Sequence, residues 1–194
     1  MTFLEELREQ RWDDHRYYHH SLVNQSLHFV SACSFIAAYV FIFIDPVRAA
    51  LLGWIVAMVS RQSGHFFFEP KGYDEENQAT HAHKEEIKVG YNLRRKVVLH
   101  AIWALVPALV YLQPTMWGLL DPTNGYVHNV AVLWLALGVA ALLFRTVQLF
   151  FIINVQSGIV WATKILTDPF NDIVLYHRAP FTLLRRWREQ TQLS

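Results

Sequence analysis

Histidine is the residue type that points most clearly to chemistry in this chain. The 194 residues include ten histidines: His15, His19, His20, His28, His65, His81, His83, His100, His128 and His177. Because imidazole is the commonest side-chain ligand for metal ions, so many of them indicate a metal site. For any one histidine taken alone, pairing with a carboxylate at a membrane surface remains an alternative.

Spacing indicates which of these histidines can share an ion. His65 and Glu69 are four residues apart, so on a helix they form two ligands, or a ligand and the carboxylate that orients it. His19 and His28 would point in opposite directions on one unbroken helix. We therefore expect a break at 20–24, with Asn24 as the N-cap of the next helix.

Composition places these residues in a membrane protein. Hydrophobic residues make up 53% of the chain, charged residues 17%, and the net charge is +1. These values exclude a disordered chain and a basic nucleic-acid binder, and the single cysteine excludes a disulfide scaffold. Most charges fall in residues 1–26, 69–96 and 162–194, and the chain between them is nearly uncharged.

The uncharged stretches predict an all-α, polytopic membrane helix bundle, a single domain over 1–194 with about four transmembrane helices. The expected spans are 25–44, 46–66, 97–113 and 127–150. No turn signal interrupts 142–147, so we expect one long helix over 130–163, with two spans as the alternative. Arg145 then marks the end of the span at the interface, or binds a lipid anion inside the bilayer.

The basic side chains set the expected orientation. They lie in the loop 69–96 and in the amphipathic tail 164–194, whereas the loop 114–125 has none. Cytoplasmic flanks are rich in Lys and Arg, so both terminal helices should be cytoplasmic, in a bacterial inner membrane or the endoplasmic reticulum. Nine of the ten histidines then lie at one face of the membrane.

Two motifs occur in a recognisable order around the first two expected spans. His19-x4-Asn24-x3-His28 opens the first span, and Gly64-His65-x3-Glu69 closes the second. In residues 17–70 the chain thereby resembles the membrane-embedded 2-hydroxy fatty acid dioxygenases of fatty-acid α-oxidation. It departs from their pattern at Gln62, which is one residue closer to His65 than expected, and in the segment that begins at Pro70.

The resemblance implies a non-haem iron(II) dioxygenase that acts on a long-chain 2-hydroxy fatty acid with dioxygen. It implies His19, His28 and His65 as metal ligands, with Glu69 and Asn24 as the catalytic candidates. Further candidate ligands are His81, His83 and His177, although His81 and His83 converge on one ion only if their segment is not helical. The candidates for holding the substrate headgroup are Lys71, Arg94 and Arg95.

Two other functions remain open at this point. The same histidines could bind zinc in a lipid hydrolase, or the chain could be a non-catalytic membrane protein for lipid binding or assembly. The expected partners are the membrane, a lipid or fatty acid and dioxygen, with no nucleic acid. Association into a homo-oligomer is also an open alternative.

Overall fold

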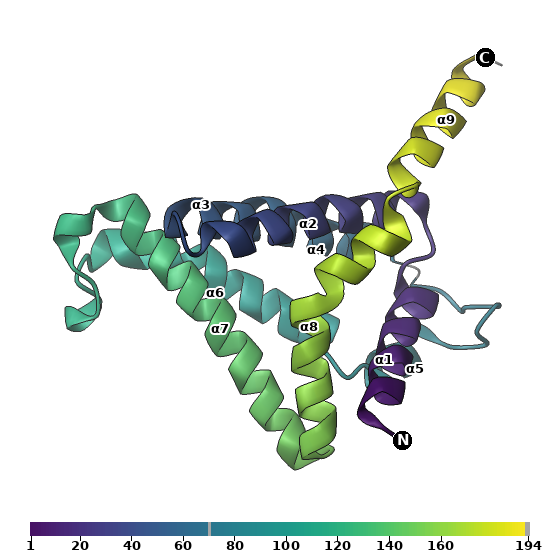
Figure 1. Cartoon of the computed structure of the whole chain (residues 1–194), viewed down its shortest axis with the longest axis horizontal. Coiled ribbons are helices and arrows are strands. Elements are labelled where there is room, and N and C mark those ends of the chain that lie inside the picture. Colours follow the sequence, from purple (N-terminus) through teal and green to yellow (C-terminus); the bar gives the residue numbers. More distant parts are fainter. Residues whose placement is uncertain (70, 193–194) are drawn as a thin grey trace.

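A computed structural model describes residues 1–69 and 71–192, and helices make up most of it (Figure 1). In chain order the helices are α1 (Phe3–Tyr18), α2 (Leu22–Phe41), α3 (Pro46–Ala50), η1 (Leu51–Met58), α4 (Val59–Phe67), α5 (His81–Ile87), α6 (Leu93–Leu112), η2 (Met116–Gly118), η3 (Pro122–Asn124), α7 (Tyr126–Ile152), α8 (Val155–Tyr176) and α9 (Ala179–Gln192). No strand occurs among these residues, which confirms the all-helical expectation. Pro70 and the last two residues of the expected tail lie outside the described residues.

The first part of the chain forms two antiparallel helical rods, which carry most of the candidate site. One is α2, and the other is the continuous run of α3, η1 and α4, in which η1 is π-helical. Asp45 makes the turn between them, since its Oδ1 accepts hydrogen bonds from the backbone N–H groups of Val47 and Arg48, both at 3.1 Å. Helices therefore occupy both of the first two expected spans.

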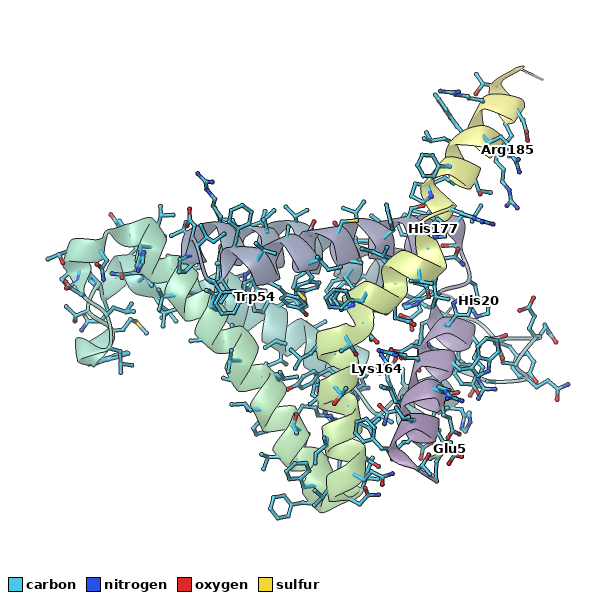
Figure 2. The ribbon with its side chains drawn as sticks, viewed as in Figure 1. Glu5, His20, Trp54, Lys164, His177 and Arg185 are labelled. Carbon is cyan, nitrogen blue, oxygen red and sulfur yellow. The ribbon has the colours of Figure 1, made fainter. Side chains whose placement is uncertain are left out.

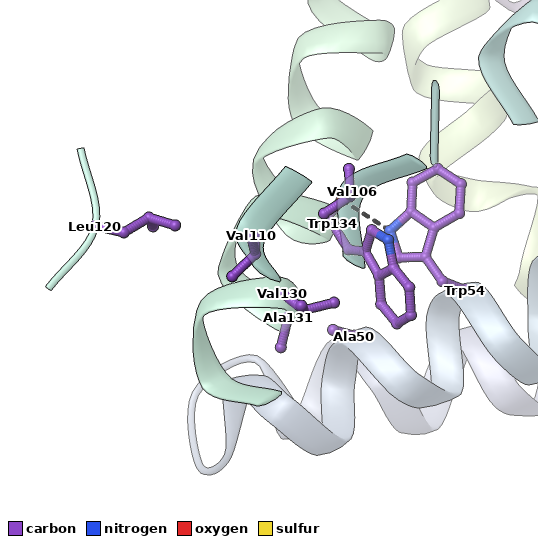
Figure 3. Close-up of a cluster of buried hydrophobic side chains, with 8 residues drawn as sticks. All are labelled: Ala50, Trp54, Val106, Val110, Leu120, Val130, Ala131 and Trp134. Atoms are coloured by element: carbon purple, nitrogen blue, oxygen red, sulfur yellow. Dashed lines mark hydrogen bonds between the residues drawn. The ribbon is translucent and has the colours of Figure 1, made fainter. Parts of the chain in front are cut away.

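The helices α6 and α7 form a second antiparallel pair. Within the described chain, Arg94–Leu112 of α6 and the whole of α7 are the two helices long and apolar enough to cross a membrane. Pro107 lies inside α6 without ending it. The pair packs against α3 and η1, at the end of the rods that we call the far end; the opposite end, which carries His28 and His65, is the near end. At the far end Trp54 donates from Nε1 to the Trp134 carbonyl at 2.8 Å (Figure 3).

The expected single helix over 130–163 is wrong. The chain turns back at residues 153–154, and α8 returns alongside α7 (Figure 1). Asn154 caps the new helix by accepting from the Ser157 N–H at 2.8 Å. Gly158 allows the close packing, because a Cβ there would lie 2.5 Å from the Phe150 ring. Asn154 is the turn signal, and it lies seven residues beyond the uninterrupted segment 142–147.

Arg145 therefore lies inside α7 and does not mark its end. Its side chain is buried and donates from Nε and Nη2 to the Val89 carbonyl at 3.1 and 2.5 Å. Nη2 also reaches the Gly90 carbonyl at 3.2 Å. The guanidinium thus fastens the end of the 69–92 loop to α7, and neither expected role for Arg145 describes this contact.

The helices α1, α8 and α9 complete the molecule. Both α1 and α2 pack on α8, which contains Pro169, and α9 extends away from the body (Figure 1). Figure 2 shows His177 at the base of α9, Arg185 on α9 itself, and Lys164 facing α1. The expected amphipathic tail 164–194 is therefore two different elements, since 164–176 belongs to the packed helix α8.

Candidate metal centre

Three histidines from three separate parts of the chain meet at the end of the rods opposite Trp54. His19 directly follows α1, His28 lies in α2 and His65 lies in α4. One ring nitrogen from each lies within 4.8 Å of the other two, and the ring centroids are 3.8, 5.0 and 5.5 Å apart. All three side chains are buried. The arrangement can hold a metal ion, as expected for these three residues.

A break between α1 and α2, where the chain changes direction, brings His19 to His28. The last helical residue of α1 is Tyr18, and α2 begins at Leu22, so the predicted break is confirmed. The N-cap is Ser21 and not Asn24: the Ser21 Oγ accepts from the Asn24 N–H at 3.1 Å. The Asn24 side chain is instead buried, and its Nδ2 donates to the Tyr18 carbonyl at 2.7 Å.

Gly64 lets α4 approach α2 at this point. A Cβ at Gly64 would overlap the Asn24 Oδ1 and lie 3.5 Å from Cδ2 of His28. Only hydrogen fits in that space, so the glycine is a steric requirement of the site. The Gly64-His65 pair thus places a ligand beside the position at which the two rods come closest.

Two of the histidines have an outer partner that determines how their rings lie. Nδ1 of His65 is 2.8 Å from Oε2 of Glu69, and Nδ1 of His19 is 2.8 Å from the Tyr176 hydroxyl. In metal sites, a partner at one ring nitrogen leaves the other nitrogen to bind the ion. Glu69 is therefore placed to orient His65, one of the two roles expected for it.

The inward nitrogens lack hydrogen-bond partners. Nε2 of His19 and both ring nitrogens of His28 are buried without any. Nδ1 of His28 lies 3.6 Å from Oδ2 of Asp172, which is too long for a hydrogen bond. Buried polar atoms in proteins are nearly always paired, so unpaired nitrogens aimed at a common point are typical of a ligand site.

Burial and neighbouring charges shift the pKa values of groups at the cluster. Burial, and then the nearby His28, lower the pKa of His19 well below its usual range, which keeps its ring neutral and able to bind. Burial raises the pKa of Glu69, although the ammonium groups of Lys88 and Lys96 oppose the shift. Lys88 lies 3.7 Å from Oε1 of Glu69.

The other candidate ligands lie outside the three-histidine group. His81 and His83 are on α5, and helical geometry turns them to different sides. His83 and His177 are exposed, whereas His81 lines a small pocket that also includes His65 and Glu69. Asn24 and Glu69 are buried beside the three histidines.

The headgroup candidates are only partly brought to the site. Lys71 lines the small pocket, but Arg94 and Arg95 are exposed and do not. Two further cations line it, Lys88 and Lys96, which the sequence reasoning missed. Helical spacing could have found Lys96, since it lies four residues before His100 on the same helix as Arg94 and Arg95.

A charged network that sequence reasoning also missed joins α1, α4 and α8 next to the histidines. Lys164 contacts both Asp14 and Asp168, the latter at 2.5 Å. Arg61 lies 3.0 Å from Asp172 and 3.8 Å from Asp168. Lys164, Asp168 and Asp172 are four residues apart and therefore lie on one face of α8. This spacing is the pattern in the sequence from which the network could have been predicted.

The comparisons give this site no precedent. No protein-family model, no curated protein and no solved structure matches the chain.

Proposed function

We propose that this protein is an integral membrane enzyme with a metal centre formed by His19, His28 and His65. The observation that carries the proposal is the convergence of three buried histidines, two of which, His19 and His28, have ring nitrogens without a protein partner. Burying unpaired nitrogens destabilises the protein by about 1–3 kcal/mol per group, and a bound metal ion would remove that cost. Three such nitrogens near one point are hard to explain by packing alone.

The membrane part of the proposal extends the two apolar helices to four spans. The candidate spans α6 and α7 pack against α3 and η1, so α2 and the second rod would lie in the bilayer beside them. Both termini would then be cytoplasmic, because the basic side chains gather in the loop and tail at the histidine end. The metal centre would lie at the cytoplasmic interface.

The chemistry that we propose is an iron(II)-dependent oxygenase reaction on a long-chain 2-hydroxy fatty acid. An iron ion held by three protein ligands would keep coordination positions open, and dioxygen and the 2-hydroxy acid would bind there. The surroundings suit an amphipathic substrate. Phe67 and Phe68 are exposed apolar surface beside the site, and the pocket next to His65 is lined by Lys71, Lys88 and Lys96.

A second function, zinc-dependent lipid hydrolysis, is favoured by the ligand set itself. All three members of the cluster are histidines and no carboxylate belongs to it. Three histidines and an open fourth position are one of the known catalytic zinc sites. Oxygen consumption with a 2-hydroxy acid separates the two reactions, because hydrolysis consumes none.

The test is metal analysis of protein purified without oxygen, for the wild type, His65→Ala and His83→Ala. We expect iron in the wild type and in His83→Ala, whose histidine is exposed and outside the cluster. We expect loss of iron, and of the product one carbon shorter than the acid supplied, in His65→Ala. Zinc without oxygen consumption would support hydrolysis, and a wild type that binds no metal would contradict the proposal.

A further inference from the structure

A chain of hydrogen bonds leads outward from the candidate metal centre. The hydroxyl of Tyr176 lies 2.8 Å from Nδ1 of His19 and 2.9 Å from Nδ1 of His15. Tyr176 is the last residue of α8 and is buried, and His15 lies in the last turn of α1. One oxygen atom thus joins a candidate ligand to a histidine outside the three-histidine group.

The number of protons in this chain leaves it only two directions. A tyrosine hydroxyl has one proton and can donate it to only one of the two nitrogens. If Tyr176 donates to His15, its oxygen is free to accept from an Nδ1–H on His19, and Nε2 of His19 carries a lone pair. If Tyr176 donates to His19, Nδ1 of His19 must accept, and the proton of the neutral ring then sits on Nε2.

Only the first direction leaves His19 able to bind a metal through its inward nitrogen. We infer that His15 and Tyr176 are positioning residues that hold His19 in the Nδ1–H tautomer, with His15 as the acceptor that gives the chain its direction. The inference rests on the metal site proposed above. It assigns a role to His15, which is not among the three clustered histidines.

The surroundings of His15 suit an acceptor. Its ring stacks on that of Tyr176, with centroids 5.8 Å apart and an interplanar angle of 25°, and Trp12 packs against it at 5.8 Å. These contacts hold Nδ1 towards the hydroxyl. Burial, and then the nearby His20, lower the pKa of His15, which keeps its ring neutral with a lone pair available.

The test compares His15→Phe, Tyr176→Phe and the double variant, all as full-length protein in detergent. Zinc titration gives the metal affinity, and nitrogen NMR of 15N-histidine-labelled, metal-free protein gives the tautomer of His19. In His15→Phe the hydroxyl has only His19 to donate to, so we expect the Nε2–H tautomer and zinc affinity about 10- to 100-fold weaker. Tyr176→Phe removes the donor, so we expect a smaller loss and mixed tautomers.

The double variant separates this mechanism from a packing effect. Without the hydroxyl, His15 has nothing to direct, so we expect the double variant to bind zinc no more weakly than His15→Phe. Losses that add would contradict the inference. Tyr39→Phe is the matched control, because it also removes a tyrosine hydroxyl that bonds to another element, here the Leu166 carbonyl of α8 at 3.1 Å, and its loss should leave zinc affinity unchanged.

Two further results would overturn the inference in distinguishable ways. If the wild type binds zinc and His15→Phe changes neither the affinity nor the tautomer, the relay is wrong and the metal site stands. If the wild type binds no metal ion, the proposed site is wrong and the relay loses its purpose with it.

Discussion

The two ends of the antiparallel rods bury opposite kinds of side chain. At the far end, Trp54 and Trp134 lie in an apolar cluster, and the indole N–H of each donates to a backbone carbonyl. At the near end, His28 and Asn24 are completely buried and carry nitrogen and oxygen atoms that bind nothing. The far end has the composition of a region that stabilises the fold, and the near end that of a region kept for a ligand.

The comparison teaches that the same pair of helices can serve both purposes because the two ends are separated along the rods. Packing at the far end can offset the cost of unpaired polar atoms at the near end. If this division is correct, substitutions at the far end should change stability and not metal affinity. Substitutions beside the histidines at the near end should change metal affinity, and substitutions in the charged network there should change stability in a way that depends on pH.

The largest expected effect on stability is that of Trp54→Ala. The change leaves a cavity in the apolar cluster and removes the hydrogen bond to Trp134, so we expect a loss of about 3–5 kcal/mol in unfolding free energy. Chemical unfolding in detergent measures the loss, and zinc titration of the folded variant should give the wild-type affinity. Trp117→Ala is the control, because Trp117 is 79% exposed and its loss should cost less than about 0.5 kcal/mol.

The second effect tests whether charge stabilises the near end. Asp14→Asn removes one of the two carboxylates on buried Lys164 and leaves Asp168, so we expect a loss of about 2–3 kcal/mol near neutral pH. Burial raises the pKa of Asp14, but the Lys164 ammonium outweighs it and holds the pKa below its usual 3.8. Unfolding free energies of both proteins from pH 7 down to pH 3 measure the effect.

The direction of the pH dependence follows from that shift. A carboxylate whose pKa is lowered on folding stabilises the protein above its unfolded pKa, and the contribution is lost as the pH falls through its folded pKa. The gap between wild type and Asp14→Asn should therefore stay constant from pH 7 to about pH 5 and shrink below about pH 4. A gap that does not depend on pH would show that Asp14 acts through packing and not through its charge.

Within the candidate site, the three histidines and Glu69 were predictable from the sequence, whereas their partners on α8 were not. His65 and Glu69 are linked by helical spacing, and the need to fold His19 back towards His28 predicts the break before α2. Both are local patterns. Tyr176 and Lys164 could not be predicted as partners of His19 and Asp14, because contacts between residues about 150 positions apart leave no periodic signal in one sequence.

The elements were predictable where apolar length decided them. Helices lie in all four expected spans, whereas the turn at Asn154 was missed because apolar residues continue on both sides of it. The helix α8 was missed for a related reason. Its Lys164, Asp168 and Asp172 make the sequence resemble an interfacial tail, yet ion pairs with α1 and α4 allow those charges to be buried.

The smallest expected effect on stability is that of Gly64→Ala, and it tests the comparison most directly. The variant and its control each add one methyl group, at different points along the contact between α2 and the second rod. In Gly64→Ala the new Cβ would overlap the Asn24 side chain, which is already held by its hydrogen bond to the Tyr18 carbonyl. Either the helices separate or that hydrogen bond breaks, and we expect a loss of about 1–3 kcal/mol in unfolding free energy. Zinc affinity should fall with it, because Tyr18 precedes His19 and His65 follows the substituted residue.

Gly53→Ala is the matched control for that variant. Gly53 lies on η1, and a Cβ there would meet only the Phe35 ring, at 4.0 Å, an ordinary van der Waals distance. Alanine also favours a helix over glycine by about 0.5–1 kcal/mol, so the control should be at least as stable as the wild type and should keep its zinc affinity. If both variants weaken zinc binding equally, the distance between α2 and the second rod along their whole length controls the site, and the proposed independence of the two ends is wrong. If only Gly64→Ala does so, the requirement for glycine belongs to the metal centre itself, because the same methyl group is accepted elsewhere on the same pair of helices.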